Sequence, residues 1–426
     1  MTLDRTLAPA FKTVDEIRVP SVETFILDNE QPVYLVRAGE QPILRLECIF
    51  EAGSCYEPLP GISTLSMKML AEGTRQRSSA QINSYLDRYG AFLESHSGTD
   101  RSSLTIYCLN KYLPEVLPLL QELLAESVIP EKELADQINI TRQNLQVNLG
   151  KNNYLASTLI RQNVFGASHP YGYRQTPETL DAIQQQMVEQ FYQQRIQNRP
   201  YRIVLAGQVT EMEFTQLNRT LGSQALTPND ADVNLPPIVT TNERTILLEK
   251  EESLQSSIRL GRLLFTRQHP DYFPVLVLNE VLGGYFGSRL MKNIREEKGF
   301  TYGIWSSLST FPRAGYWTIG TDVKREFTQQ TLDETRKEIR RLQEELVPDE
   351  EMDVVKNYMA GSFVGSLNTP FEIADRYKGI LLDGLPADYL TTYIDNLRAV
   401  SAEQVLEMAN KYLQEKDLIE VVVGGK

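Results

Sequence analysis

Cysteine and histidine are both scarce in this chain of 426 residues. They are Cys48, Cys55 and Cys108, and His96, His169 and His269. The cysteines are odd in number and never spaced C-x-x-C, which disfavours a disulfide framework or a cysteine zinc site and fits a reducing compartment. The histidines lie far apart in the sequence, with no ligand spacing among them. His169, in the turn-like "SHPYG", is predicted to be structural, and a rearranged metal site using one or two histidines stays the alternative.

Long apolar runs are missing too. No segment approaches the length of a membrane span, and the N-terminus has no apolar stretch behind a basic start. Basic residues are outnumbered, with 43 Lys and Arg against 56 Asp and Glu, so the net charge is −13. This balance argues against binding to nucleic-acid phosphates. We expect a soluble, cytoplasmic protein with no nucleic-acid or membrane partner.

Short motifs of several other protein classes are also absent. The sequence has no G-x-S-x-G, no Walker A motif and no dinucleotide fingerprint. The glycines of "VLGGYFGSRL", which include Gly283 and Gly284, follow a helix-like apolar run and not a strand. They therefore make only a weak case for a phosphate-binding loop.

What the chain does contain is one pattern used twice. In the first half, "PVYLVRA" and "ILRLECIFEAG" are β-rich runs joined like a hairpin, and "TILLEKEESLQSSIRLGRLLF" repeats that layout in the second half. The later strand-like runs "SSLTIYCL" and "AGYWTIGTDV" correspond, as do the helix starts "VIPEKELADQI" and "LVPDEEMDVVK". The pattern predicts an α+β fold of two homologous two-layer sandwich domains, mainly antiparallel sheet plus helices, which face each other across a groove.

Each half also contains a helix with apolar residues at helical spacing, which predicts one face buried against a sheet. These residues are Leu117, Leu120, Leu123 and Leu124 in the first half, and Leu332, Ile339, Leu342 and Leu346 in the second. Between the halves, "LGSQALTPNDADVNLPPIVTTNE" is rich in Pro, Asn, Asp and Thr and has no periodicity. We therefore predict an N-terminal domain over 1–221, a linker over 222–244 and a C-terminal domain over 245–426.

The stretch "SRLMKNIREEKGFTYG" resembles the arginine–tyrosine signature of the pitrilysin-type metallopeptidases, the inverted zincins, whose relatives include mitochondrial processing peptidase. Their Arg and Tyr, seven positions apart, correspond to Arg295 and Tyr302. The preceding "VLGGYFGSRL" resembles the family's glycine-bearing segment, and its Gly283 and Gly284 become implied substrate-binding positions. The likeness covers nearly the whole chain, because the duplicated layout, "EAGSCYEP", "HPYG" and the closing strand follow in family order. Without the resemblance, Arg295 would be interpreted as a surface residue and Tyr302 as a core residue with its hydroxyl at the rim.

The same resemblance places a zinc-binding helix at "GISTLSMKMLAEGT". Active relatives carry H-x-x-E-H there, because ligands at i and i+4 share one helical face and the Glu reaches the metal-bound water. This chain has Thr64, Met67 and Lys68 at those three positions. The family's third ligand, a Glu expected around Arg142 to Leu145, is missing as well, since 137–177 contain no Asp or Glu. We therefore predict no metal site and no cofactor in this chain.

The resemblance implies a non-catalytic, substrate-binding subunit of a heterodimeric zinc metalloendopeptidase. The implied partner is a homologous chain that carries H-x-x-E-H and the zinc. Arg295 and Tyr302 would then act in trans on a peptide or unfolded polypeptide, stabilising the negative charge that develops on the scissile carbonyl. Two alternatives stay open, an inactive homologue that serves as a scaffold and a homodimeric peptide-binding module.

Overall fold

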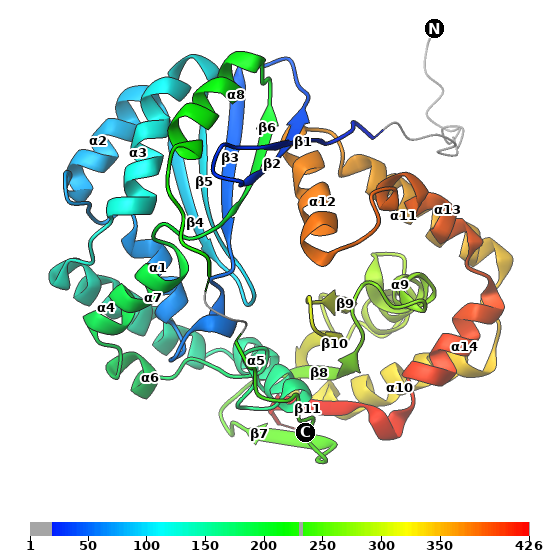
Figure 1. Ribbon diagram of the computed structural model, residues 1–426. Coiled ribbons are helices and arrows are strands. Elements are labelled where there is room, and N and C mark those ends of the chain that lie inside the picture. Colours follow the sequence, from blue (N-terminus) through cyan, green and yellow to red (C-terminus); the bar gives the residue numbers. More distant parts are fainter. Residues whose placement is uncertain (1–18, 230–232, 426) are drawn as a thin grey trace, which may run out of the picture.

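Two β-sheets, one in each half of the chain, form the frame of the molecule in the computed structural model (Figure 1). The structure describes residues 19–229 and 233–425. Residues 1–18 of the predicted N-terminal domain, 230–232 of the predicted linker and residue 426 lie outside this description. The α+β fold of two sandwich-like domains that face each other is confirmed.

The first sheet has six strands, and its central strand is almost entirely buried. In spatial order the strands are β1 (Glu23–Ile26), β2 (Pro32–Arg37), β6 (Arg202–Gly207), β3 (Ile43–Phe50), β5 (Ser102–Leu109) and β4 (Phe92–Ser97). Successive side chains of a strand point to opposite faces of its sheet. The even-numbered Leu44 and Leu46 of β3 therefore enter the main core, while Arg45 and Glu47 point to the other face.

The second sheet repeats this arrangement with five strands. In spatial order they are β7 (Thr245–Glu249), β11 (Ile419–Gly424), β8 (Gln255–Leu264), β10 (Gly315–Lys324) and β9 (Ile304–Thr310). The order β2-β6-β3-β5-β4 of the first sheet matches β7-β11-β8-β10-β9 of the second, and the first pair of each run is parallel. The predicted internal duplication is therefore present in the topology as well as in the sequence.

Helices cover both sheets. Those of the first half are α1 (Ile62–Met69), α2 (Ser79–Tyr89), α3 (Leu113–Glu126), α4 (Glu131–Leu149), α5 (Asn152–Phe165), α6 (Pro177–Asp181), α7 (Gln185–Arg195) and α8 (Glu211–Leu217). Those of the second half are α9 (Tyr272–Asn279), α10 (Thr328–Glu344), α11 (Asp349–Gly365), α12 (Pro370–Asp383), α13 (Tyr389–Ala399) and α14 (Ala402–Tyr412). Two π-helical segments, η4 (Glu280–Gly284) and η5 (Met291–Glu297), follow α9. No helix of the described residues is long and apolar enough to cross a bilayer.

The predicted apolar stripes lie on α3 and α10. All four leucines of the α3 stripe are buried, and so are the first three members of the α10 stripe. The prediction for Leu346 is wrong, since its side chain is 52% exposed. The reason is that α10 ends at Glu344, so Leu346 no longer follows the helical period of the stripe.

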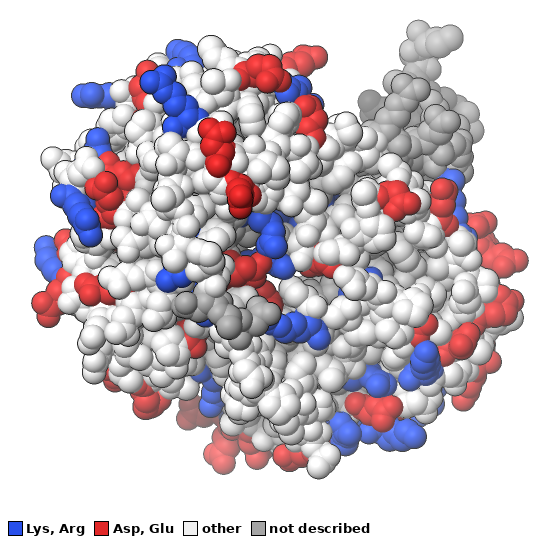
Figure 2. All heavy atoms as spheres, viewed as in Figure 1, with Lys and Arg blue, Asp and Glu red and all other residues white. Residues whose placement is uncertain are grey.

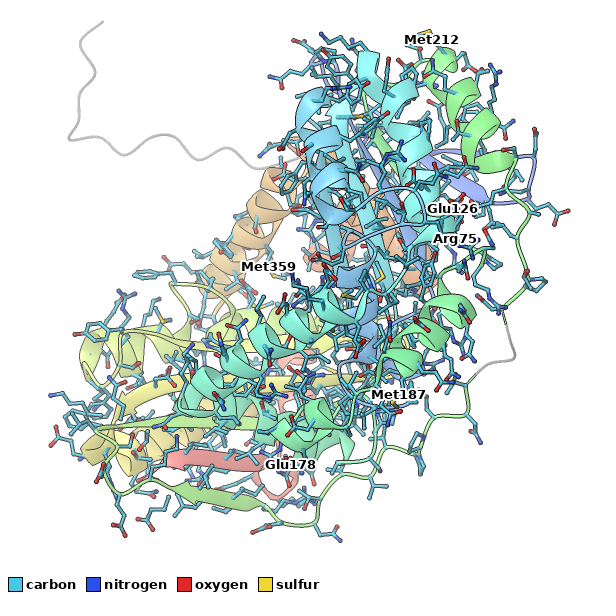
Figure 3. The ribbon with its side chains drawn as sticks, turned by 90° about the vertical axis from the view of Figure 1, so that its left-hand side faces the viewer. Arg75, Glu126, Glu178, Met187, Met212 and Met359 are labelled. Carbon is cyan, nitrogen blue, oxygen red and sulfur yellow. The ribbon has the colours of Figure 1, made fainter. Side chains whose placement is uncertain are left out.

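The two halves exchange one helix each. Helix α5 of the first half packs on the second sheet, where Ile160 lies against Gly261 of β8. Helix α12 of the second half packs on the first sheet, where Ala374 joins a small core with Val204 of β6. Figure 1 shows α5 beside β8 and β11, and the side view of Figure 3 shows the orange second-half segment beside the blue strands of the first sheet.

Polar contacts fix the exchanged helix α12 on the first sheet. The guanidinium of Arg45 on β3 donates to both carboxylate oxygens of Asp375 on α12, at 2.9 and 3.1 Å. Beside it, the ammonium of Lys378 on α12 lies 2.9 Å from the carboxylate of Glu47. Neither half is therefore complete without the other, because each sheet has one face partly covered by a helix from the opposite half.

Candidate functional site

Helix α1 carries the three positions at which the resemblance places a zinc motif. It begins after Gly61, whose positive φ of 106° favours glycine, and the first turn is held where the Ser63 N–H donates to Glu57. Thr64 is exposed and Lys68 is partly exposed on one face of the helix, as the i, i+4 spacing requires. Met67 is only 1% exposed and belongs to the main core. The helix therefore presents a hydroxyl and an ammonium where ligands would be needed, and neither suits zinc.

The residues at which the third zinc ligand was expected form an ion pair and part of the core. On α4, the guanidinium of Arg142 reaches Asp181 at 2.5 Å. Leu145 is 4% exposed and packs in the main core. Over the residues that the structure describes, no group of three or more His, Cys, Asp or Glu side chains could hold a metal ion. The residues present do not fit the zinc of the family.

The three histidines are placed on separate elements. His96 lies exposed on the edge strand β4. His169 is buried, and its Nδ1 accepts the N–H of Tyr171 at 3.1 Å. Burial, with a contribution from the charge of Arg313, lowers the pKa of His169. His269 stacks on Phe265 with ring centroids 4.1 Å apart. His169 is thus a buried histidine with a backbone partner, as the sequence analysis predicted.

The arginine and tyrosine of the second half lie on either side of a turn that leads into an edge strand. Arg295 is on η5, and its guanidinium lies over the ring of Phe286, 4.6 Å from the ring centroid. Tyr302 stands two residues before β9 and is 96% exposed. The interpretation of Tyr302 as a core residue is therefore wrong, because its ring packs against almost nothing in this chain.

The turn that presents Tyr302 is itself held firmly. The Thr301 hydroxyl donates to the Asp322 carbonyl at 2.8 Å and accepts the Gly303 N–H at 3.1 Å. The Thr321 hydroxyl of β10 donates to the Gly303 carbonyl at 2.9 Å. These contacts fix the backbone on both sides of Tyr302 while its side chain stays in solvent. A phenol held in this way is available to a molecule outside the chain.

The two glycines implied as substrate-binding residues have a structural reason to be glycine. Gly283 is buried against β9, and a Cβ there would lie 2.7 Å from the Ser306 backbone nitrogen. A Cβ on the exposed Gly284 would collide with the carboxylate of Glu280. Close packing thus accounts for both residues, and a contact with substrate stays a prediction.

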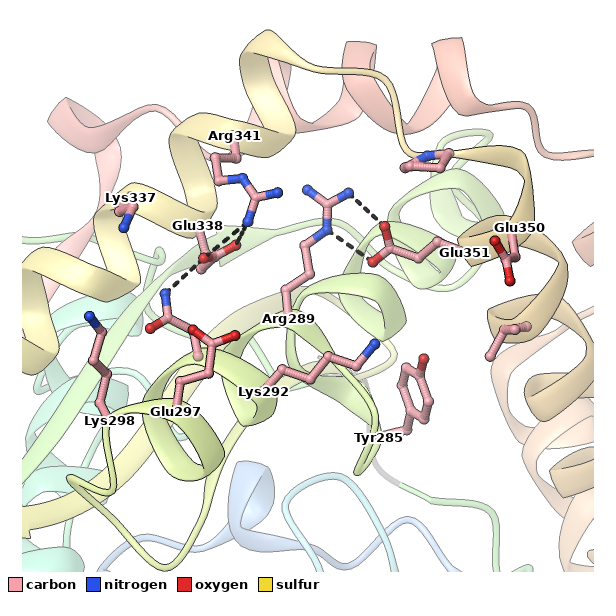
Figure 4. Close-up of a pocket in the computed structure, with 13 residues that line it drawn as sticks. Tyr285, Arg289, Lys292, Glu297, Lys298, Lys337, Glu338, Arg341, Glu350 and Glu351 are labelled. Carbon is pink, nitrogen blue, oxygen red and sulfur yellow. Dashed lines mark hydrogen bonds and ion pairs between the residues drawn. The ribbon is translucent and has the colours of Figure 1, made fainter.

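Sequence reasoning did not find the charged cavity behind η5, which Figure 4 shows. Its volume is about 610 Å³, and its wall carries five basic and four acidic side chains. The guanidinium of Arg289 donates to both carboxylate oxygens of Glu351 at 3.0 and 2.8 Å, and Arg341 pairs with Glu338 at 3.1 Å. The Arg289–Glu351 pair ties the segment before η5 to α11, whereas the Arg341–Glu338 pair lies within α10.

These observations define a class of protein. A doubled α+β unit has the order of a two-domain peptidase chain, with a partly exposed Arg295 and an exposed Tyr302 in its second half and no H-x-x-E-H on the helix of its first half. The chain belongs to peptidase family M16. The family model described as "Insulinase (Peptidase family M16)" matches residues 33–169, and the one described as "Peptidase M16 inactive domain" matches residues 182–359.

Several known proteins are similar over most of this length. "Uncharacterized zinc protease YmxG" of Bacillus subtilis is 25% identical over 85% of this chain and 88% of its own. "Non-peptidase homolog YmxG" of Helicobacter pylori is 22% identical over 86% and 85%. "Mitochondrial-processing peptidase subunit beta" of Rattus norvegicus is 21% identical over 94% and 84%.

Solved structures have the same fold. A peptidase M16 inactive domain from Pseudomonas fluorescens superposes with a TM-score of 0.86 at 24% identity, covering 95% of this chain and 98% of that one. A protease from Helicobacter pylori gives a TM-score of 0.85 at 15% identity, covering 96% and 100%. The two-domain arrangement is therefore that of the family, and this chain is an M16 homologue without the family's zinc motif.

Proposed function

We propose that this chain is the non-catalytic, substrate-binding subunit of a two-chain zinc metalloendopeptidase. A homologous partner would hold the metal and the general base, and this chain would supply Arg295 and Tyr302 to the partner's site. The substrate class is a peptide or an unfolded polypeptide. The proposal goes beyond the family assignment, which leaves the partner and the roles of both side chains undetermined.

One observation carries the proposal. Tyr302 is 96% exposed on a turn whose backbone is fixed by three hydrogen bonds, while α1 holds no zinc ligands. An exposed tyrosine contributes almost no packing energy to its own chain. Contact of the phenol with another molecule would explain why a rigid turn holds it in solvent. The name of the Helicobacter pylori relative, a non-peptidase homologue, agrees with a chain that does not cleave peptides by itself.

The chemistry of the two side chains fits a substrate that develops negative charge. A phenol hydroxyl donates one hydrogen bond, which strengthens as the scissile carbonyl oxygen gains charge in the transition state. The Arg295 guanidinium is permanently charged and offers several N–H donors to substrate carbonyls. Its guanidinium lies over the Phe286 ring, 4.6 Å from the centroid, and this contact restricts its motion. Tyr302 would act mainly in the transition state, and Arg295 in the bound substrate as well.

The first test is assembly. The chain and its nearest zinc-bearing homologue from the same organism are co-expressed, with an affinity tag on one chain only. We expect co-purification in a stable one-to-one complex, which cleaves peptides that neither chain cleaves alone. Isolation of this chain only as a monomer or self-dimer, beside a homologue that is fully active alone, would contradict the proposal.

The second test is kinetic and uses the assembled complex. Tyr302→Phe removes one hydroxyl and keeps the ring, so assembly should be unchanged. We expect kcat to fall on the order of a hundredfold with little change in KM, as for other single oxyanion donors. Tyr358→Phe, which alters a half-exposed tyrosine on α11, is the matched control and should keep full activity. Full activity of the assembled Tyr302→Phe complex would overturn the role in trans and favour a scaffold or a peptide-binding module.

A further inference from the structure

The charged cavity behind η5 contains a buried donor without a partner. Arg289 stands at the start of the helical stretch that includes η5, and its side chain is only 8% exposed. Its Nε and Nη2 donate to the Glu351 carboxylate at 3.0 and 2.8 Å. Its Nη1 is buried and has no hydrogen-bond partner among the described residues. An unpaired N–H of a buried charged group is costly, so this nitrogen calls for an acceptor from outside the chain.

Three helical segments form the wall around this guanidinium. Arg289 and Lys292 come from the stretch that includes η5, and Figure 4 shows both side chains extending into the space between α10 and α11. Arg341 of α10 lines the same cavity and pairs with Glu338 of its own helix at 3.1 Å. The cavity volume of about 610 Å³ lies in the usual range of small-molecule sites. The space is therefore large enough for an organic ligand as well as for water.

One basic side chain of the wall is free to meet a ligand. The wall carries five basic residues, of which Arg289 and Arg341 are paired with carboxylates. Lys298 and Lys337 share a glutamate of α10 that lies outside the wall. Lys292 is exposed and has no ion pair within the described part of the chain. The free ammonium and the free Nη1 can only donate, so the ligand must present an acceptor, and a negatively charged one binds best.

The rest of the wall decides the kind of anion. Four acidic side chains also line the cavity, and two of them, Glu297 and Glu350, are exposed. A phosphate group carries about two negative charges at pH 7 and would be repelled by these acids more than a carboxylate with one charge. Tyr285, Pro348 and Val354 add an apolar part to the wall. The expected ligand therefore carries one carboxylate and a small apolar body.

We propose that this cavity binds a small organic acid with a single carboxylate and an apolar body. The carboxylate accepts from Nη1 of Arg289 and from the ammonium of Lys292, and the body lies against the apolar part of the wall. The ligand thus supplies the acceptor that Arg289 lacks, through charge-assisted hydrogen bonds. Neither Arg295 nor Tyr302 lines the cavity. The inference is therefore independent of the proposed function and is tested on the isolated chain, without a partner or an activity assay.

The probe for this site is benzoate, and benzamide is its neutral control of nearly the same shape. Isothermal titration calorimetry of the full-length chain at pH 7 and constant ionic strength measures the affinity of each. We expect benzoate to bind in about the millimolar range and benzamide at least about tenfold more weakly. Inorganic phosphate should also bind more weakly than benzoate. Equal affinity for benzoate and benzamide would overturn the carboxylate site, and tighter binding of phosphate would overturn the class of ligand.

Two exposed wall residues should shift the benzoate affinity in opposite directions. Lys292→Gln removes the free cation and should weaken binding about threefold, whereas Glu350→Gln removes an acid and should strengthen it by about the same factor. Lys324→Gln changes a lysine that is 71% exposed outside the cavity, and this matched control should leave the affinity unchanged. All three positions are exposed, so the fold should be unaffected. Unchanged affinity in both Lys292→Gln and Glu350→Gln would contradict the site.

A double variant tests the buried end of the cavity. Arg289→Met/Glu351→Leu replaces both members of the ion pair with apolar groups, a change that is often nearly neutral for stability because no charge is left unpaired. Benzoate binding should fall at least about tenfold, while the urea unfolding profile stays close to that of the wild type. Benzoate affinity at the wild-type level in the folded double variant would overturn the inference. If the double variant does not fold, the exposed substitutions Lys292→Gln and Glu350→Gln decide the question.

Discussion

Three residues of α1 explain why this helix lacks the zinc-binding motif of the family. Thr64 and Lys68 share the exposed face, while Met67 is turned into the main core with 1% of its surface exposed. Restoring the motif therefore changes two surface residues and one core residue. The third ligand is also missing, because Arg142 pairs with Asp181 and Leu145 is buried.

We expect the triple variant Thr64→His/Met67→Glu/Lys68→His to bind no tightly held zinc. It should lose about 2–4 kcal/mol of unfolding free energy, because a carboxyl group replaces a buried thioether without a partner. Metal analysis of the purified protein and urea unfolding are the measurements. The control Thr64→His/Lys68→His changes one exposed and one partly exposed position, leaves the core residue Met67 in place, and should stay within about 0.5 kcal/mol of the wild type. One zinc per chain in the triple variant would mean that another side chain supplies the third ligand.

At the scale of secondary-structure elements, the exchanged helix α12 is held by an ion pair whose two partners differ in exposure. The Arg45 side chain is 6% exposed, whereas that of Asp375 on α12 is 48% exposed. Burial opposes ionisation of Asp375, but the hydrogen bond and charge of Arg45 outweigh it and lower the pKa of the carboxyl group. The pair thus stabilises α12 on the first sheet while Asp375 is ionised.

Asp375→Ala should cost about 2 kcal/mol of unfolding free energy. Loss of one partner of a buried pair typically costs more, but half of Asp375 is in solvent and the value is reduced accordingly. Since its folded pKa lies below the unfolded value of about 3.9, the contribution is present above that pH and disappears as the pH falls through the folded pKa. Urea unfolding at pH 7 and pH 3 measures both. Asp333→Ala, at an exposed i,i+3 pair on α10, is the control and should change little; an equal loss in both variants would contradict the role of Asp375.

At the scale of the whole molecule, exchange of α5 and α12 makes the two halves interdependent. The apolar face of α5 packs with Ile419, Val421 and Val423 of β11, so this face would meet water in an isolated first half. In the same way Ile373 of α12 would lose its contacts with the first sheet. Figure 2 shows acidic and basic side chains interspersed over the face of both halves that is turned to the viewer.

We expect fragments 1–229 and 230–426 to be insoluble or poorly folded when each is expressed alone. Co-expressed, they should associate, because the exchanged helices supply apolar contacts that need no covalent link. Circular dichroism and co-purification on a tag carried by one fragment are the measurements. Intact chain with a protease site inserted between residues 229 and 230, cut after folding, is the control and should stay together. Two independently stable fragments with no affinity for each other would contradict this interdependence.

Local patterns account for the parts of the fold and site that could be predicted. The paired strand-like runs predicted both sheets, and the apolar stripe from Leu117 to Leu124 predicted the buried face of α3. The failure at Leu346 has a local cause as well, since the period was extended beyond the last helical turn. The exposure of Tyr302 was missed for a different reason, because residue type alone favours burial of a tyrosine at a strand start.

The sequence by itself determined the duplication, the α+β class and the absence of the H-x-x-E-H motif, because these depend on residue identity and on spacing along the chain. Thr64, Met67 and Lys68 do not form the H-x-x-E-H ligand set, and this is read from the sequence alone. Only the tertiary structure decided that α5 and α12 cross to opposite sheets and that Tyr302 stands free. Those features depend on contacts between residues tens to hundreds of positions apart, and no local pattern specifies which distant surface a helix or ring will meet.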